Sequence, residues 1–302
     1  MTERIRFMIY TVTLNPSIDY SVFPAEFRAG EINRSEREVH SFGGKGINVS
    51  AMLANLGAES TALGFIGGFS GREIERLARR AGVKCDFCEI SEPSRINVKI
   101  ISDTETAVNG KGPFIRLEEE RALIEKLASL SEEDTVVVSG SAPESESGAL
   151  LRNVLDAAEK ARLVVDMDGA ALKYALTKKP YLIKPNYEEL CALFGKEEMS
   201  DNEIASAAAG LRRDGVGNVL VSLGGRGALL ASSDGNIYRV AAPQVDVVST
   251  VGAGDSFLAG FLAGEERGAQ FALSLASAAG SATAACERIA DAADVMEIFA
   301  RM

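Results

Sequence analysis

Residues 248–257 read VSTVGAGDSF, and the apolar run FLAGFLA occupies residues 257–263. The run has helical character, so the small-residue turn at 252–254 leads into a helix whose first turn carries Asp255. A turn with almost no side chains lets backbone N–H groups converge with the free donors of the helix N-terminus, which favours binding of a phosphoryl group. Asp255 then either caps the helix or takes the proton of a hydroxyl that attacks the phosphoryl group.

The composition is that of an ordinary globular protein. The 302 residues are 46% hydrophobic and 25% charged, which is enough to bury a sizeable core. The net charge of −11, with no basic run, argues against nucleic acid as a partner. No apolar stretch approaches the roughly 20 residues that span a bilayer, so we expect no membrane contact. The first seven residues have no long apolar region of a secretory signal, and we interpret residues 1–7 as an extension or a mis-called start.

The cysteines suit a reducing cytoplasm, which is where we expect the protein to work. Cys85 and Cys88 have the spacing of a metal or redox pair. A second pair and a nearby histidine are both missing, so we interpret them as two thiols placed by chance on a strand.

Short apolar strands alternate with amphipathic helices over most of the chain. Strand-like runs lie at 8–14, 61–65, 135–139, 163–166, 181–184, 219–222 and 227–231; helix-like runs lie near 71–81, 117–129, 148–161, 186–194, 202–214, 254–264, 268–286 and 291–301. This alternation predicts one α/β domain over residues 8–302, with a mainly parallel sheet covered on both faces. Two β-rich segments, at about 21–41 and 94–110, stand outside the pattern and predict a small flap or lid.

Ligands of parallel sheets bind at the carboxyl ends of the strands. Five candidate residues fall at such ends or just beyond them: Asp19, Ser139, Lys184, Ser222 and Asp255. Asp19 closes the turn-like stretch NPSID at 15–19, so it is either an Asx-turn residue or an acceptor of hydrogen bonds from a polyol.

Residues 43–49 read GGKGINV and open a helix that stops at Gly57. The spacing is not that of a Walker A loop. Glycines at a helix N-terminus, with Lys45 and Asn48, suit a phosphorylated and hydroxyl-rich ligand. The alternative is a glycine turn chosen for its geometry alone.

Two further motifs lie later in the chain. Asn186 and Glu189 form a near capping box, and the same oxygens could hold the water shell of a Mg²⁺ ion that arrives with nucleotide phosphates. The two roles are compatible. Residues 222–227 read SLGGRG, a glycine turn between two strands, and no helix follows as a dinucleotide fingerprint would require.

Together these motifs resemble the PfkB or ribokinase-like family of sugar kinases. Residues 43, 44 and 48 match its N-terminal signature, residues 246–256 its C-terminal signature, and Asn186 with Glu189 its metal-associated motif; the matches extend from about residue 10 to residue 286. The stretches at 13–19, 43–49, 95–99, 138–141 and 182–186 resemble the branch that phosphorylates fructose 1-phosphate. The sister branch, which phosphorylates tagatose 6-phosphate, shares most of them, and residues 95–99 (RINVK) favour the first branch. The resemblance implies a ribokinase-like three-layer α/β sandwich with a small β lid.

The resemblance also implies residue roles. Asp255 would be the base that deprotonates the C6 hydroxyl of fructose 1-phosphate for attack on ATP. The implied anion hole is Gly252, Ala253 and Gly254; the sugar site is Asp19, Gly43, Gly44, Asn48 and Ser139, with Lys45 and Arg95 at the sugar phosphate; the nucleotide site is Lys184, Ser222, Gly224 and Gly227; the Mg²⁺ site is Asn186 and Glu189. Lids of this type pair between subunits, which implies a homodimer through the lid.

Two rival classes make different demands on the sequence. A non-catalytic sugar-phosphate sensor on this fold would be expected to lose the base or the anion turn, and both are present. A dinucleotide-dependent oxidoreductase needs Gly-x-Gly-x-x-Gly after the first strand, where this chain has Asn15-Pro16-Ser17.

Overall fold

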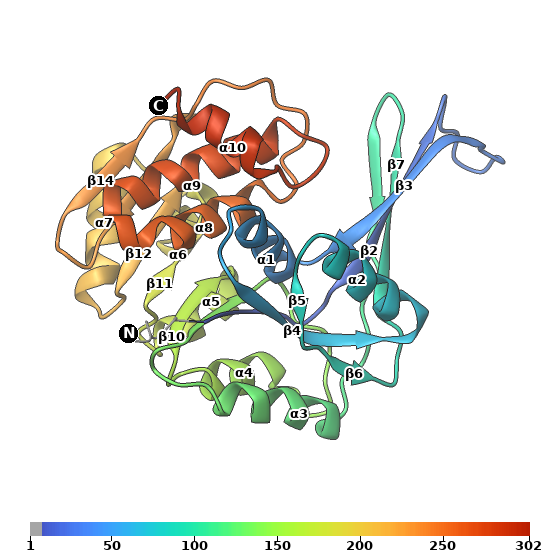
Figure 1. Cartoon of the computed structure of the whole chain (residues 1–302), viewed down its shortest axis with the longest axis horizontal. Coiled ribbons are helices and arrows are strands. Elements are labelled where there is room, and N and C mark those ends of the chain that lie inside the picture. Colours follow the sequence, from blue (N-terminus) through green and yellow to red (C-terminus); the bar gives the residue numbers. More distant parts are fainter. Residues whose placement is uncertain (1–7) are drawn as a thin grey trace, which may run out of the picture.

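A computed structural model of the chain describes residues 8–302, so the extension expected at residues 1–7 lies outside the described residues. A ten-stranded sheet runs through its centre in the order β14-β13-β12-β11-β10-β9-β1-β4-β5, with β6 also paired to β4 (Figure 1). Its neighbours are parallel except in the pairs β12–β13 and β13–β14. The strands are β1 (Ile9–Thr13), β4 (Ser60–Gly67), β5 (Lys84–Cys85), β6 (Cys88–Ile90), β9 (Thr135–Ser139), β10 (Arg162–Asp166), β11 (Leu182–Ile183), β12 (Asn218–Ser222), β13 (Ala228–Ala231) and β14 (Ile237–Val240).

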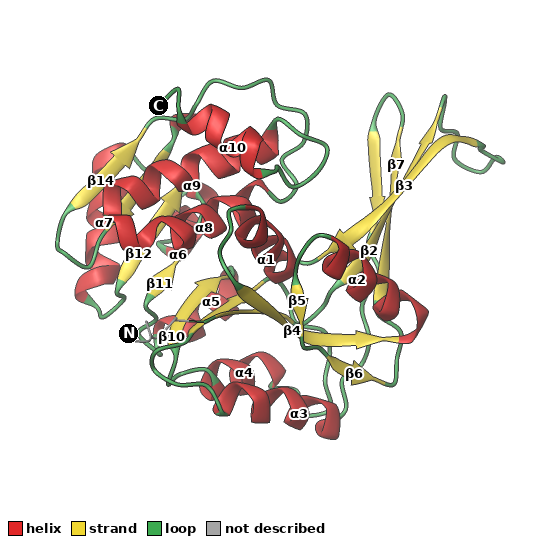
Figure 2. Ribbon diagram, viewed as in Figure 1, coloured by secondary structure: helices red, strands yellow, loops and turns green. Residues whose placement is uncertain are grey.

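Helices cover both faces of this sheet (Figure 2). Successive side chains of a strand point to opposite faces, so Val136 and Val138 of β9 pack into one core cluster and Val137 into the other. The first cluster is closed by α3 (Leu117–Ala128), α4 (Leu150–Ala157), α5 (Gly169–Leu176), α6 (Tyr187–Leu193) and α7 (Asp201–Arg213). The second is closed by α1 (Lys45–Asn55), α8 (Ala253–Gly264), α9 (Ala269–Ala284) and α10 (Ala292–Phe299). The predicted three-layer α/β sandwich is thereby confirmed.

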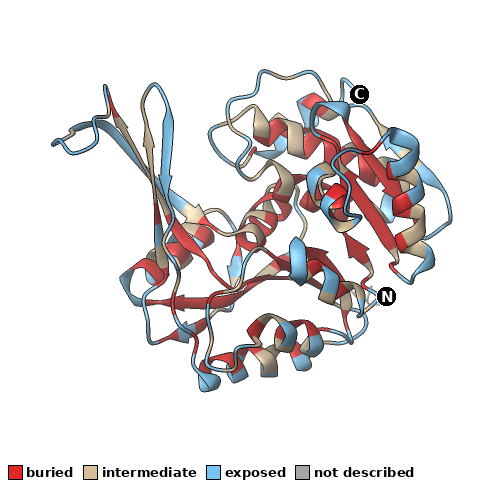
Figure 3. Cartoon of the chain, turned by 180° about the vertical axis from the view of Figure 1, so that it is seen from behind, coloured by how far each residue is buried: buried red, intermediate tan, exposed pale blue. Residues whose placement is uncertain are grey.

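A second, four-stranded sheet projects from one end of the molecule (Figure 1). Its order is β3-β2-β7-β8, formed by β2 (Ser17–Pro24), β3 (Ser35–Gly43), β7 (Arg95–Ile101) and β8 (Glu105–Val108). We call it the small sheet. Its root packs on α2 (Gly68–Arg80) through Ile18, while its outer part is largely exposed (Figure 3).

The structure differs from the sequence prediction in several places, among them β14, a strand that the sequence pattern did not predict. Asp19 does not lie in a turn, because Ser17–Pro24 pairs with both β3 and β7 and is therefore a strand. The strand expected at 181–184 shortens to β11, since Pro185 has no N–H with which to extend the ladder. Helix α5 was missed because it has only eight residues and begins at a glycine.

The remaining expectations concern thiols and membranes. Cys85 packs with the cluster around α2, whereas Cys88 lies in the cluster under α3, so the two thiols occupy different cores and the spacing is incidental. Over residues 8–302, no helix is both long and apolar enough to cross a membrane.

Candidate active site

Polar side chains form a row along the carboxyl edge of the large sheet. Moving across neighbouring strands, the row contains Asn15 just after β1, Ser139 on β9, Asp166 on β10, Lys184 just after β11, and Ser222 on β12. The register places Ser139 directly beside Asp166. Because parallel strands end at one edge, residues far apart in the chain are brought into a single line.

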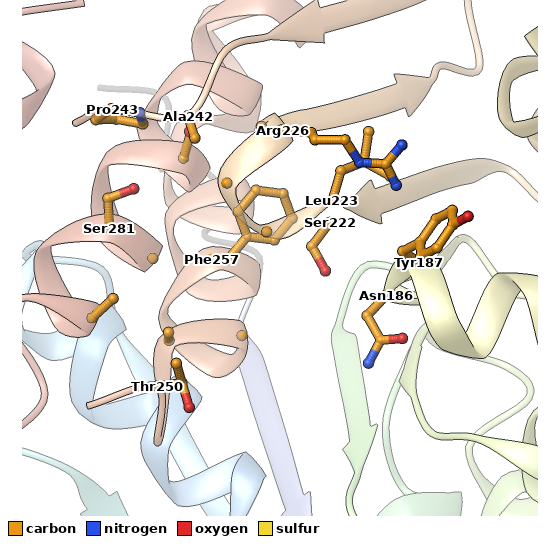
Figure 4. A pocket seen from close by; sticks show the side chains of 18 of the residues that line it. Asn186, Tyr187, Ser222, Leu223, Arg226, Ala242, Pro243, Thr250, Phe257 and Ser281 are labelled. Carbon is orange, nitrogen blue, oxygen red and sulfur yellow. The ribbon is translucent and has the colours of Figure 1, made fainter. Parts of the chain in front are cut away.

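Two cavities open along this row. The larger, of about 1230 Å³, lies between the turn after β12 and the helices α8 and α9 (Figure 4). The smaller, of about 570 Å³, lies between the small sheet, α1 and the ends of β1, β9 and β10. Both are lined by Asn186, Ser222, Thr250 and Gly254, so the cavities meet at the start of α8.

The turn before α8 presents free amides to this meeting point. Gly252 is the N-cap residue with a left-handed φ of 76°, which glycine adopts without strain. Ala253 N donates to the Thr250 carbonyl at 3.3 Å, longer than a typical N–H···O bond. The N–H groups of Gly252 and Gly254 have no acceptor among the described residues, so they remain available to an anion.

Asp255 lies beside these amides and is only 6% exposed. It does not cap α8; one carboxylate oxygen, Oδ2, instead accepts a hydrogen bond from Asn48 Nδ2 at 2.8 Å. Burial, followed by the nearby charge of Asp166, raises the pKa of Asp255 from 3.8 to about 6. A carboxylate with such a pKa is ionised at neutral pH and a stronger base than an exposed aspartate.

Asp166 gathers two lysines at the same place. Its Oδ1 lies 3.3 Å from Lys45 Nζ and 3.2 Å from Lys184 Nζ, and the carboxylate is 1% exposed. Burial of the Lys45 ammonium lowers its pKa, but Asp166, Asp255 and Glu189 outweigh that effect and leave the Lys45 pKa above its usual value. Asp166 Oδ2 is buried and has no partner among the described residues. Asp166, Lys45 and Lys184 together carry one net positive charge beside the free amides.

The small sheet contributes a polar wall to the smaller cavity. Ser17 Oγ donates to Asp19 Oδ1 at 2.7 Å, and Asn97 Nδ2 donates to both, at 3.0 and 2.8 Å. Asp19 and Asn97 are cross-strand neighbours, so they share one face of the sheet. A Cβ on Gly43 would lie 2.6 Å from Asp19 Oδ1, which explains why this position is a glycine.

Arg95 supplies a cation at the same end. Its guanidinium is half-buried, and its Nε and Nη1 donate to the carbonyls of Asn15, at 3.1 Å, and Gly110, at 3.5 Å. Burial lowers the pKa of Arg95, although the nearby Asp19 counteracts it. Within residues 8–302 no carboxylate forms an ion pair with Arg95, so its charge is available to a ligand.

The larger cavity combines backbone and aromatic surface. Ser222, Gly224 and Gly227 line it, and Arg226 lies over the Tyr187 ring at 4.4 Å (Figure 4). The turn is tight, because a Cβ on Gly227 would lie 2.0 Å from the Val240 carbonyl oxygen.

The predicted capping box at the start of α6 is present. Asn186 Oδ1 accepts from Glu189 N at 2.7 Å, and Glu189 Oε2 accepts from Asn186 N at 2.9 Å. Both residues also line the smaller cavity. The described residues contain no cluster of three or more His, Cys, Asp or Glu side chains that could hold a metal by itself. The donor set therefore fits a metal that keeps its waters and arrives with phosphates.

All predicted site residues except Gly43 line one or both cavities, and Gly43 packs against the side chains of Ser17 and Asp19. Sequence reasoning missed four others that the fold brings here: Asn15, Ser17, Asn97 and Asp166. Asp166 could have been found, since it ends a predicted strand with a carboxylate. Asn97 could not have been found, because only the pairing between β2 and β7 brings its side chain to Asp19.

Comparison with known proteins gives consistent results. The profile of the pfkB family carbohydrate kinases matches residues 12–297. The 1-phosphofructokinase of Bacillus subtilis is 42% identical over 286 residues, which cover 93% of this chain and 94% of the relative. The D-tagatose-1-phosphate kinase of Bacillus licheniformis is 38% identical and covers 94% of this chain and 95% of the relative.

Solved structures agree in fold. Phosphofructokinase-2 from Escherichia coli, in complex with substrates and products, superposes with a TM-score of 0.89 at 30% identity over 97% of this chain and 98% of that one. Ribokinase of Arabidopsis thaliana, in complex with ribose and ATP, has a TM-score of 0.78 at 22% identity, over 97% of this chain and 98% of that one. At this identity the likeness supports the fold only.

Proposed function

The chain belongs to the pfkB family of carbohydrate kinases, and we propose that it transfers the γ-phosphoryl group of ATP to the C6 hydroxyl of fructose 1-phosphate, giving fructose 1,6-bisphosphate. It is a sugar-phosphate kinase. The observation that carries the proposal is the position of Asp255, a buried carboxylate with a raised pKa beside free amides where the two cavities meet.

Asp255 acts as the base. It takes the proton of the C6 hydroxyl as that oxygen forms a bond to the γ-phosphorus, while the bond from the phosphorus to the bridging oxygen of ADP breaks. Asn48 holds the carboxylate through Oδ2, which leaves Oδ1 for the substrate. The N–H groups of Gly252 and Gly254, at the positive end of α8, stabilise negative charge on the transferring group.

The acceptor sugar occupies the smaller cavity. Arg95, which lacks a carboxylate partner within residues 8–302, binds the sugar phosphate. Asp19, fixed by Ser17 and Asn97, accepts from ring hydroxyls. The other predicted residues of this end are Gly43, Gly44, Asn48 and Ser139, and Ser139 Oγ is buried without a partner among the described residues.

The nucleotide occupies the larger cavity along Ser222, Gly224 and Gly227, with its phosphates toward α8. Lys45 and Lys184, held together by Asp166, neutralise charge at the transferring phosphoryl group. The sequence led us to expect Lys45 at the sugar phosphate with Arg95, but its ion pair with Asp166 favours this place instead. Mg²⁺, when bound, shields the phosphate charges and orients the nucleotide. Asn186 and Glu189 would hold its water shell.

The small sheet acts as a lid, and we expect it to pair with the same sheet of a second chain. Its inner face carries Asp19 and Asn97 to the sugar, so its closure excludes water that would otherwise accept the phosphoryl group. Farther out, Val39 on the inner face is 43% exposed and Val108 on the opposite face is 60% exposed. A partner subunit would cover such apolar surface. Loss of the dimer in Val39→Glu and Val108→Glu, measured by light scattering, tests this arrangement.

Substrate identity is tested by coupled ADP release with a panel of sugar phosphates. We expect the highest kcat/KM with fructose 1-phosphate, compared with fructose 6-phosphate, tagatose 6-phosphate and tagatose 1-phosphate. Because kinases for both tagatose phosphates are among the relatives, a higher kcat/KM with either tagatose ester would overturn the assignment. No ADP release with any of the four, despite measurable binding, would favour a non-catalytic sensor.

A further inference from the structure

A fructofuranose ring is nearly symmetric, and this creates a recognition problem for the enzyme. Turning the ring over exchanges C1 with C6, C2 with C5, and C3 with C4. After this exchange every substituent of the ring coincides with an equivalent one, with a single exception. The anomeric hydroxyl on C2 coincides with a hydrogen, because C5 carries no hydroxyl at that position. A site that selects a 1-phosphate over a 6-phosphate therefore needs a polar group facing the carbon next to the phosphate-bearing carbon.

The phosphate end of the cavity is marked by Arg95. Its guanidinium is held by two backbone carbonyls, and the nearer of these belongs to Asn15, at 3.1 Å from Nε. Asn15 therefore lies beside Arg95, at the end of the cavity where the proposed function places the sugar phosphate. Asn15 is 6% exposed and lines the smaller cavity.

Within residues 8–302, the side-chain amide of Asn15 forms no hydrogen bond to another protein group. Its Oδ1 is one of the buried polar atoms without a partner among the described residues, and an unpaired buried acceptor is costly unless a ligand satisfies it. The amide is also confined. A Cβ on Gly112 would lie 2.4 Å from Oδ1, so the chain after β8 packs closely against it and only glycine fits there.

Several other polar groups of this end already have protein partners. Ser17, Asp19 and Asn97 bond to one another, and Thr13 Oγ1 accepts from Ile47 N at 3.1 Å. Ser139 Oγ and Asp166 Oδ2 also lack partners within the described chain, but they lie on β9 and β10 and make no contact with Arg95 that would place them at the phosphate. Asn15 is thus the uncommitted group beside Arg95.

We propose that the Asn15 amide hydrogen-bonds the anomeric hydroxyl of a ketose 1-phosphate and selects it over ketose 6-phosphates. The inference rests on the proposed function, because it takes the phosphate to be at Arg95 and the reacting hydroxyl at Asp255. A hydroxyl both donates and accepts, so it pairs with the amide in either orientation. A 6-phosphate bound the same way would present hydrogen to the amide and leave it unpaired.

The test uses an analogue that lacks only the group in question. In 2,5-anhydro-D-mannitol 1-phosphate the anomeric hydroxyl is replaced by hydrogen, and its free primary hydroxyl still reaches Asp255. We compare kcat/KM for fructose 1-phosphate and for this analogue in the wild type, Asn15→Leu and Asn15→Ala. Ser139→Ala tests the rival assignment of this contact, because it removes another unpartnered hydrogen-bonding group of the same cavity.

We expect the wild type to favour fructose 1-phosphate by roughly tenfold or more, as for removal of one hydroxyl from a matched site. In both Asn15 variants the ratio should fall to within about threefold of one, while turnover of the analogue stays near the wild-type value and shows an intact site. Ser139→Ala should keep the wild-type ratio.

Three results would overturn the inference. Equal kcat/KM values of the wild type for the two substrates would refute the inference. This result needs no variant, so it can be obtained even if a variant does not fold. An equal loss on both substrates in the Asn15 variants shows a purely structural role, and a collapsed ratio only in Ser139→Ala assigns the contact elsewhere. Failure of the proposed function looks different, because the wild type would then not phosphorylate fructose 1-phosphate.

Discussion

Replacing Asp255 by asparagine should make the enzyme slower and the protein more stable. The carboxamide has nearly the same shape, and its oxygen can still accept from Asn48 Nδ2. It cannot accept the proton of the sugar hydroxyl. A positioned base contributes about 10²–10⁴-fold, so kcat should fall by that factor with little change in KM.

The stability gain follows from the raised pKa. Burial and Asp166 hold the pKa of Asp255 near 6 instead of 3.8, so the folded state resists ionisation of this group. A shift of about 2 units lowers the unfolding free energy by about 3 kcal/mol above pH 6, and this cost disappears as the pH falls toward 4. Asp255→Asn removes this cost, so its Tm should exceed that of the wild type by several degrees at pH 8 and approach it at pH 4.

Coupled ADP release and thermal unfolding at the two pH values measure both effects. Asp103→Asn, at the exposed turn between β7 and β8, makes the same chemical change away from the cavities and should alter neither kcat nor Tm. Near wild-type turnover in Asp255→Asn would remove it from the role of base. A lower Tm than the wild type at pH 8 would refute the argument that its buried charge is destabilising.

Three further predictions concern the same site. The kcat/KM for the sugar should fall about tenfold per pH unit below pH 6, where Asp255 becomes protonated. Asp166→Asn should move this acidic limb of the pH–rate profile to lower pH, because Asp255 loses a negative neighbour. An acidic limb at the same pH in Asp166→Asn would refute the idea that Asp166 raises the pKa of Asp255. In Gly43→Ala the added methyl group would displace Asp19, so the KM for the sugar phosphate should rise several-fold while that for ATP stays constant, as initial-rate kinetics will show. Gly227→Ala places a methyl group against backbone at a φ of 92°, so we expect a lower Tm and weaker ATP binding by calorimetry, and unchanged values would contradict the tight turn.

Local sequence was enough to predict the elements that meet at the site. The glycine turn before Asp255, the capping box of Asn186 and Glu189, and the glycines at 43 and 44 are defined by neighbours within a few residues, so their chemistry is visible in the chain. The alternation of apolar strands and helices likewise predicted the parallel sheet and its active edge. The helix cap first considered for Asp255 was wrong, because a partner 207 positions away, Asn48, takes its carboxylate.

Only the tertiary structure decided which distant segments of the chain pair with one another. Asp166 joins Lys45 to Lys184 because β10, which ends at Asp166, is the neighbour of β11, which leads to Lys184, and because the start of α1 brings Lys45 to the same edge of the sheet; no local pattern encodes that arrangement. Asn97 fixes Asp19 only through the pairing of β7 with β2. The sequence by itself determined which chemical groups are present and how each local turn presents them. Strand order and register determined their distances, and therefore the raised pKa of the base and the unpaired amide of Asn15, because charge coupling and desolvation depend on separation in space.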